Sequence, residues 1–164
     1  DTMIRPLYRK VLVLINGSEA SIQAAMYGIL MSKLYKCELK AVYVVDSETL
    51  KQLTLNKFFV AQESKEYEES LTSDGKKYLE YVENLAKSKG VKIETELKNG
   101  SVWSETISIA TEMEADLILL GGSDSNTKDK KDILSSSYRE ILINAPCSVQ
   151  LVREKKIDQL YKLA

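Results

Sequence analysis

Short runs rich in valine, leucine and isoleucine alternate along this chain with segments of helical periodicity, and this alternation strongly constrains the fold. Runs that are apolar at nearly every position suit strands that are covered on both faces, which is typical of parallel sheets. The strand and helix segments follow one another in the order β-α-β-α-β-α-β-α-β. We therefore predict an α/β protein with a five-stranded parallel open sheet and helices on both faces. The predicted strands are Lys10–Asn16, Leu39–Val45, Lys92–Leu97, Asp116–Leu120 and Ser148–Arg153.

Two segments between the first three strands carry helical periodicity. Ser18 follows the glycine turn after the first strand and is suited to cap a helix. The second segment, Glu66–Lys89, ends before Gly90, which suits the C′ position, although Gly75 weakens its early part. Residues 47–63, which precede it, show no clean period and are predicted to be a loop or a short, poorly packed helix. The inward stripes are Ile22, Ala25, Met26, Ile29, Leu30 and Leu34, and then Leu71, Tyr78, Leu79, Val82, Leu85 and Ala86.

Two further helices are predicted in the second half of the chain. One follows the turn at Gly100-Ser101. The other opens with a capping box, in which the side chains of Ser137 and Glu140 each accept a hydrogen bond from the other residue's backbone N–H. This helix is predicted to stop near Ala145-Pro146. The residues expected to face the core are Ile107, Ala110 and Met113 in the first, and Ile141 and Leu142 in the second.

The chain of 164 residues suits a single domain with a sizeable core. We predict an irregular segment over 1–9, an α/β domain over 10–153 and an amphipathic tail over 154–164. The tail carries Ile157, Leu160 and Tyr161 at helical spacing, so it could lie on the domain or on a partner.

The charge balance and the apolar runs exclude several classes of function. The formal net charge is -1, which gives a polyanion no general attraction, so no nucleic-acid partner is expected. No apolar run approaches the length that spans a membrane, so no membrane insertion is expected. Two cysteines are too few for a disulfide framework, and the cytoplasm is the expected location.

The sequence contains no histidine, which removes the commonest general base and the commonest metal ligand. Cys37 and Cys147 could in principle join carboxylates at a metal, but free cysteines more often act as small buried hydrophobes. No acid–base pair stands out either. We expect no catalytic residues and no metal site.

Polar and glycine residues follow three of the predicted strands. Ligands of open parallel sheets bind at the carboxyl ends of the strands, and phosphates favour a glycine turn followed by a helix N-terminus. The candidate site therefore collects residues after the first, second and fourth strands. Its members are Asn16, Gly17, Ser18, Val44, Gly121, Gly122, Asp124, Ser135, Ser136 and Ser137.

Several of these segments together resemble the universal stress protein family. The opening KVLVLINGSEAS is similar to the family's first strand and its Asp-Gly-Ser turn, and the second strand ends similarly at Val44-Val45-Asp46. Gly100, the run from Ala115 to Gly121, and Ala145-Pro146-Cys147 also fit in order and spacing. The resemblance implies a Rossmann-like fold of the adenine-nucleotide alpha-hydrolase type, and ATP across the strand ends in members that bind nucleotide. It also implies homodimers that pair through the last strand, here Val149, Gln150, Leu151 and Val152.

The chain departs from the ATP-binding pattern that the resemblance implies. Val44, Gly121 and Ser136 match, but Asn16 replaces an aspartate, and Asp124 and Ser135 replace two glycines of the phosphate loop. A side chain forced into the left-handed conformation costs about 1–2 kcal/mol, and Asp124 places a carboxylate near a triphosphate. In the other direction, three serines at a helix N-terminus still offer hydrogen-bond donors to an anion.

Simpler roles compete for the same residues. The serine triplet could have the purely structural role of capping the last helix. Likewise, Gly121-Gly122 could have the purely structural role of a tight turn after the strand. Gly121–Ser125 also matches the loop of ATP pyrophosphatases, but that loop follows the first strand of its domain, whereas here it follows the fourth. Met31-Ser32-Lys33, part of a synthetase signature, sits in the middle of a predicted helix, and the Asn-Gly-Ser tripeptides at Asn16 and Asn99 suit turns.

We therefore expect a non-enzymatic regulatory or protein-interaction domain in stress response, with weak or absent ATP binding. No cofactor is expected, or ATP or AMP if any. The alternative is an ATP-binding, nucleotide-dependent switch of the same family. An exposed last strand needs a partner or a cover, and the tail around Ile157 could provide that cover.

Overall fold

The computed structural model of the chain describes residues 3–57, 59–122 and 136–164. It contains a five-stranded parallel sheet in the order β3-β2-β1-β4-β5, which confirms the predicted fold class. Each observed strand lies within about a residue or two of its predicted range. The strands are β1 (Lys10–Ile15), β2 (Glu38–Val45), β3 (Ile93–Asn99), β4 (Leu117–Gly121) and β5 (Ser148–Val152).

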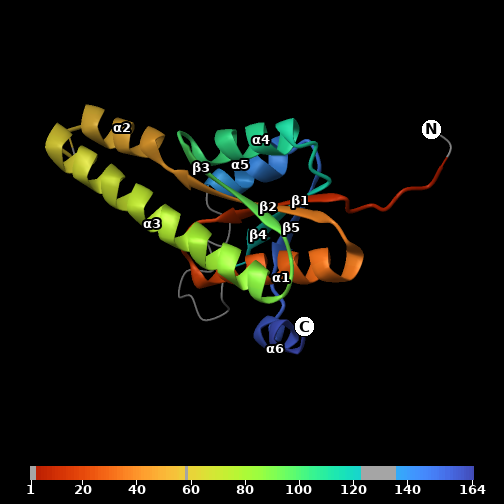
Figure 1. Cartoon of the computed structure of the whole chain (residues 1–164). Helices are drawn as coiled ribbons and strands as arrows, with labels where there is room; N and C mark the ends of the chain where they lie inside the picture. Colours follow the sequence, from red (N-terminus) through yellow and green to blue (C-terminus); the bar gives the residue numbers. More distant parts are fainter. Residues whose placement is uncertain (1–2, 58, 123–135) are drawn as a thin grey trace.

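Helices cover both faces of the sheet, as Figure 1 shows. Odd-numbered residues of β1 such as Val13 face a core shared with α1 and α3, and even-numbered residues such as Leu12 face a core shared with α4 and α5. Burial on both faces explains why the central strands are apolar at nearly every position beyond their amino ends. The helices are α1 (Glu19–Tyr35), α2 (Ser47–Leu55), α3 (Ala61–Ser88), α4 (Val102–Glu112), α5 (Ser136–Asn144) and α6 (Ile157–Leu163).

The first helix begins at the predicted cap and buries Ala25 and Ile29 as predicted, but the rest of its buried stripe differs from the prediction. Ser18 has extended φ and ψ, and its Oγ accepts a hydrogen bond from the Ser21 backbone at 3.1 Å. Leu34, expected to face the core, is 66% exposed. The small residues Ala24 and Gly28 lie against the sheet instead, where an added Cβ at Gly28 would lie 2.9 Å from Leu39.

The segment 47–63 is not a loop. Asp46 caps α2, since its carboxylate accepts from the Thr49 backbone at 3.1 Å, and α3 begins at Ala61, five residues earlier than predicted. Only Leu50 of α2 is buried, so the expectation of poor packing holds and explains why no period was visible. In Figure 1, α2 and the first half of α3 extend beyond the sheet as a helical hairpin.

The helices of the second half need two corrections. In α4, Ile109 is buried at 1% exposure, whereas the predicted Ile107 lies at the margin of the core. In α5, Ser136 is already helical, so Ser137 lies within the first turn and does not cap it. The Glu140 carboxylate accepts a hydrogen bond from the Asn144 side chain at 3.1 Å. Leu142, expected to pack inward, is 42% exposed, and Ile141 is fully buried.

The C-terminal tail lies on its own domain. Ile157 is 1% exposed, and α6 packs against α1, below the body of the molecule in Figure 1. The Tyr161 hydroxyl donates to the Leu85 carbonyl of α3 at 2.7 Å. The Lys89 ammonium lies 4.6 Å from the centre of the Tyr161 ring. These contacts place the tail on the α1–α3 layer.

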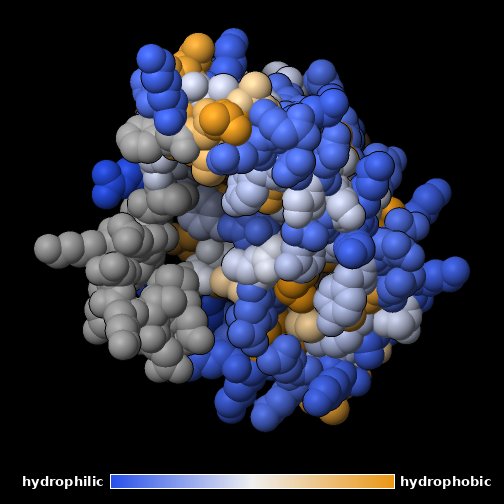
Figure 2. Space-filling view, turned by 90° about the vertical axis from the view of Figure 1, so that its left-hand side faces the viewer, coloured by the Kyte–Doolittle hydropathy of each residue, from blue (hydrophilic) through white to orange (hydrophobic). Residues whose placement is uncertain are grey.

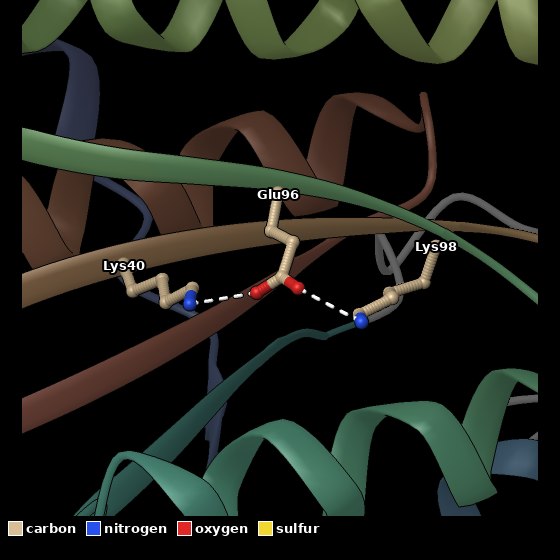
Figure 3. Close-up of polar contacts among 3 residues, drawn as sticks. All are labelled: Lys40, Glu96 and Lys98. Atoms are coloured by element: carbon tan, nitrogen blue, oxygen red, sulfur yellow. Dashed lines mark ion pairs between the residues drawn. The ribbon is translucent and has the colours of Figure 1, made fainter.

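The polar strand β3 is an edge strand, as its composition indicated, and it carries an ion-pair chain. The Glu96 carboxylate lies 2.7 Å from the Lys40 ammonium of β2 and 3.0 Å from that of Lys98 (Figure 3). The Lys40 ammonium holds the pKa of the Glu96 carboxyl below its ordinary value, with burial opposing and Lys98 adding to the effect. No helix within the described residues combines the length and apolarity needed to cross a membrane.

We predict that Gly75→Ala destabilises the protein by about 1–2 kcal/mol, although alanine is the better helix former by about 1 kcal/mol. An added Cβ would lie 2.6 Å from the Tyr43 ring and 2.8 Å from Leu97, so the strands could not pack as closely on α3. Urea unfolding measures the change, with the exposed Ser73→Ala of the same helix as control. A more stable Gly75→Ala variant would show that helix propensity outweighs the packing.

We predict that Glu96→Gln lowers the free energy of unfolding by about 0.5 kcal/mol at pH 7. Because the folded-state pKa of Glu96 is depressed, its contribution is present above the unfolded-state value and disappears as the pH falls through the folded-state value. The difference between wild type and variant should therefore shrink as the pH falls and vanish once Glu96 is protonated in the folded protein as well. Glu94→Gln, an exposed carboxylate on the same strand, is the control, and an equal effect there would contradict the ion-pair explanation.

Candidate functional site

The sheet opens at the carboxyl ends of its two central strands. β1 and β4 pair only as far as Val13 and Leu119. β1 continues alongside β2 to Ile15, and β4 continues alongside β5 to Gly121. The two strands therefore part over their last two residues. This split is the switch point of the sheet, where the connections leave in opposite directions and where open parallel sheets bind their ligands.

Figure 2 looks onto the end of the molecule at which the strands finish. Hydrophilic residues dominate the coloured surface, with small hydrophobic areas between them. The predicted site residues gather here from separate elements. Asn16 follows β1, Val44 lies one residue before the end of β2, and Gly121 ends β4.

Tyr138 of α5 occupies the split between β1 and β4. Its side chain is 8% exposed, and it hydrogen-bonds with the Asn16 side chain and the Gly121 backbone, one partner on each side of the split. Burial raises the pKa of the Tyr138 phenol, and the two hydrogen bonds offset part of that rise. The phenol is therefore neutral at physiological pH, and its hydroxyl joins the two strand ends.

Asn16 takes part in a local hydrogen-bond network with the cap of α1. Its Oδ1 accepts from the Ser18 backbone at 3.0 Å and from the Ser18 hydroxyl at 2.6 Å. The amide nitrogen is then the group left to meet Tyr138. An aspartate at this position could accept from the same groups but could not donate.

The glycines of the site are required by packing. A Cβ on Gly121 would lie 2.5 Å from the carbonyl carbon of Ala20, so the end of β4 touches the first turn of α1. A Cβ on Gly122 would lie 2.7 Å from the Val152 carbonyl, which accepts from the Gly122 backbone at 2.9 Å. Gly17 has a φ of +83°, and a Cβ there would meet the Tyr78 ring at 2.7 Å. Close backbone approach inside the fold explains all three without a ligand.

The remaining predicted residues divide into two groups. Val44 is 8% exposed and packs in the core shared with α4 and α5. Ser136 and Ser137 lie in the first turn of α5, two residues and one residue before Tyr138. Asp124 and Ser135 lie outside the described residues, as does most of the predicted phosphate loop.

The sequence analysis did not identify Tyr138 as a residue of the candidate site. It follows the serine triplet directly, and the capping interpretation assigned this helix turn to Ser137 and Glu140. The available signal for its role was a tyrosine, an aromatic residue with a polar hydroxyl, in the first turn of a helix that faces a strand end.

The two cysteines do not come together. Cys37 packs on the α1–α3 side of the sheet and Cys147 against the α4–α5 side. Burial raises the pKa of both thiols, so both are protonated at neutral pH. Within the described ranges, no group of three metal-ligating side chains is found.

Comparison with known proteins assigns this architecture to a family. Residues 7–153 match the family model described as the universal stress protein family. A universal stress protein of Methanocaldococcus jannaschii is 32% identical over 151 residues, which are 92% of this chain and 85% of that protein.

Solved structures share the fold at low sequence identity. The universal stress protein UspA from Lactobacillus plantarum has a TM-score of 0.73 at 20% identity, covering 91% of this chain and 100% of the other. The universal stress protein from Archaeoglobus fulgidus, solved in complex with dAMP, has a TM-score of 0.61 at 12% identity, covering 90% of this chain and 100% of the other.

We predict that Tyr138→Phe lowers the free energy of unfolding by about 1 kcal/mol, because it removes the hydroxyl that bridges Asn16 and Gly121 but keeps the ring. Urea unfolding measures the change. Tyr81→Phe is the control, since Tyr81 is 50% exposed on α3 and should change stability little. Equal stability of the two variants would mean that the bridge contributes nothing.

Proposed function

This chain belongs to the universal stress protein family, and we propose that within it the chain is a regulatory or protein-interaction domain in stress response and not an enzyme. We further propose that it binds ATP weakly or not at all in the manner of nucleotide-binding relatives. The observation that carries this proposal is Tyr138, which lies in the split between β1 and β4 with its hydroxyl bonded to both sides.

The nucleoside end of a strand-end ligand would meet groups that are already engaged. Asn16 Oδ1 accepts two hydrogen bonds from Ser18, and Ser18 Oγ serves the Ser21 backbone at 3.1 Å. A ligand would have to break this network, and each broken bond within it costs about 0.5–1.5 kcal/mol.

The part of the site that would hold the phosphates departs from the phosphate-binding pattern in its sequence. Asp124 and Ser135 stand where the resemblance places glycines that let the backbone approach phosphate. Gly121 and Gly122 are retained, but their contacts with Ala20 and Val152 account for them independently of any ligand. Among the described residues of this end, Gly121 and Gly122 therefore do not by themselves support a triphosphate site.

The rival function is a nucleotide-dependent switch, and one finding favours it. The universal stress protein from Archaeoglobus fulgidus was solved in complex with dAMP, an adenine nucleotide. Val44 and Ser136 match the pattern here. On this reading ATP or AMP would be the ligand, and Tyr138 would have to move when it binds.

We also propose a cytoplasmic homodimer. β5 lies at the free edge of the sheet, and Val149, Gln150 and Leu151 are only partly buried there, so the edge is suited to pairing with a second copy. The two free cysteines are consistent with a reducing compartment.

The test is thermal and calorimetric titration with Mg-ATP and with AMP. We expect no significant stabilisation of the wild type, whereas a binder would gain about 2.7 kcal/mol at a hundredfold excess over its dissociation constant. Tyr138→Ala, and separately Asp124→Gly with Ser135→Gly, should each increase the stabilisation that ATP gives. Tyr81→Ala is the matched control for the loss of an aromatic ring. A full shift in the wild type would favour the switch.

A further inference from the structure

A second hollow lies at the opposite end of the molecule from the split. Its volume is about 690 Å³, and it lies at the amino ends of β1, β2 and β3, between the last turns of α1 and α3. The proposed function does not use it. A volume of this size is in the range of small-molecule sites.

The lining of this hollow is strongly basic. Six lysines and two glutamates line it, a formal balance of +4, whereas the whole chain carries -1. We call it the lysine basin. Its charged residues are Lys10, Lys33, Lys36, Lys40, Lys89, Lys92, Glu38 and Glu94.

The basin has a balanced half and a basic half. On the β1–β2–β3 side, Lys10 is paired in register with Glu38, and Lys40 with Glu94, so charges of both signs alternate. On the side of the helix ends, the lining carries four lysines and no carboxylate. These are Lys33, Lys36, Lys89 and Lys92.

Two lysines of the basic half are held by α6, and two are not. Lys33 Nζ donates to the Ala164 carbonyl, and the Lys89 ammonium lies over the Tyr161 ring at 4.6 Å. Lys36 and Lys92 are exposed, and among the described residues neither belongs to an ion pair. Their charges are available to a ligand.

Helix ends explain only part of this charge. Lysines often sit at helix C-termini, where each macrodipole presents roughly half a negative charge. Two such ends, those of α1 and α3, offset about one of the four positive charges, so about three remain. An accumulation of like charge in a concave surface raises the local concentration of anions.

The walls of the basin are fixed by the fold. Lys36 ends α1 in the left-handed conformation with a φ of 60°, and its backbone donates to the Ser32 carbonyl at 2.9 Å. The Ser32 hydroxyl donates to the Cys37 carbonyl at 2.7 Å, and the Val91 backbone donates to Ala86 at 2.9 Å. Binding therefore requires ordering of lysine side chains but not of the backbone.

We propose that the lysine basin binds a soluble anion with several linked phosphates, such as an oligophosphate chain. Lysine ammoniums act as point charges toward phosphate, and no arginine lines the basin to form the two-pronged pairs that carboxylates favour. Linked phosphates can engage lysines at both helix ends at once, which suits a hollow of this volume.

The test is calorimetric titration of the full chain with inorganic tripolyphosphate, which carries no nucleoside. Binding should weaken about tenfold in Lys36→Gln with Lys92→Gln, and it should also fall as salt rises. The matched control, Lys76→Gln with Lys77→Gln, removes the same charge from exposed positions on α3 outside the basin and should leave affinity unchanged. Tyr138→Ala, at the other end of the molecule, should leave it unchanged as well.

Four results would overturn the proposal. The first is no binding of tripolyphosphate by the wild type. The second is equal weakening in the basin variant and in the Lys76/Lys77 control, which would indicate general charge attraction. The third is binding only to vesicles that display phosphoinositide headgroups, which would assign the charge to a membrane surface. A fourth is stronger binding of tripolyphosphate by Tyr138→Ala than by the wild type, which would place the anion at the strand ends and would bear on the proposed function instead.

Discussion

The structure depends on the exclusion of water from both faces of the central strands. Val11, Leu12, Val13 and Leu14 of β1 are all at most 1% exposed, so each successive side chain enters an opposite core. Such a strand can be covered on both sides only if the connections leave it in two directions. The split between β1 and β4 is the geometric consequence, and it is where the chain must place polar groups.

Close packing at this split reduces the room for a ligand. Gly121 touches the first turn of α1 on one face of the sheet, and Tyr138 enters from α5 on the other. Both contacts stabilise the fold, and both lie at the split between β1 and β4. Residues that could contact a phosphate here make packing contacts within the protein. A residue such as Gly121 that matches the nucleotide-binding pattern therefore does not by itself indicate nucleotide binding.

The sequence predicted the strands well because their signal is continuous and local. It predicted helix faces less well, since Leu34 has the right spacing but is 66% exposed. Which positions of a helix meet the sheet is determined only by the tertiary structure. The α2 segment gave no period because a single residue, Leu50, is buried. The site residues after the strands were found from topology, whereas Tyr138 was not, because its role depends on which way α5 faces.

The two ends of the sheet have different electrostatic characters, and the direction of the helices explains this. All strands are parallel, so the helices that return beside them place their C-termini at the amino ends of the strands. Lysines there complement the partial negative charge at the C-termini of α1 and α3. Because there are more lysines than these helix dipoles neutralise, the surface keeps a net positive charge that attracts anions. Around the split at the carboxyl ends, the described residues Asn16, Ser18 and Tyr138 instead offer neutral amide and hydroxyl groups that hydrogen-bond within the protein. The unpaired lysines of the basin thus lie at the amino ends of the strands, away from the split between β1 and β4.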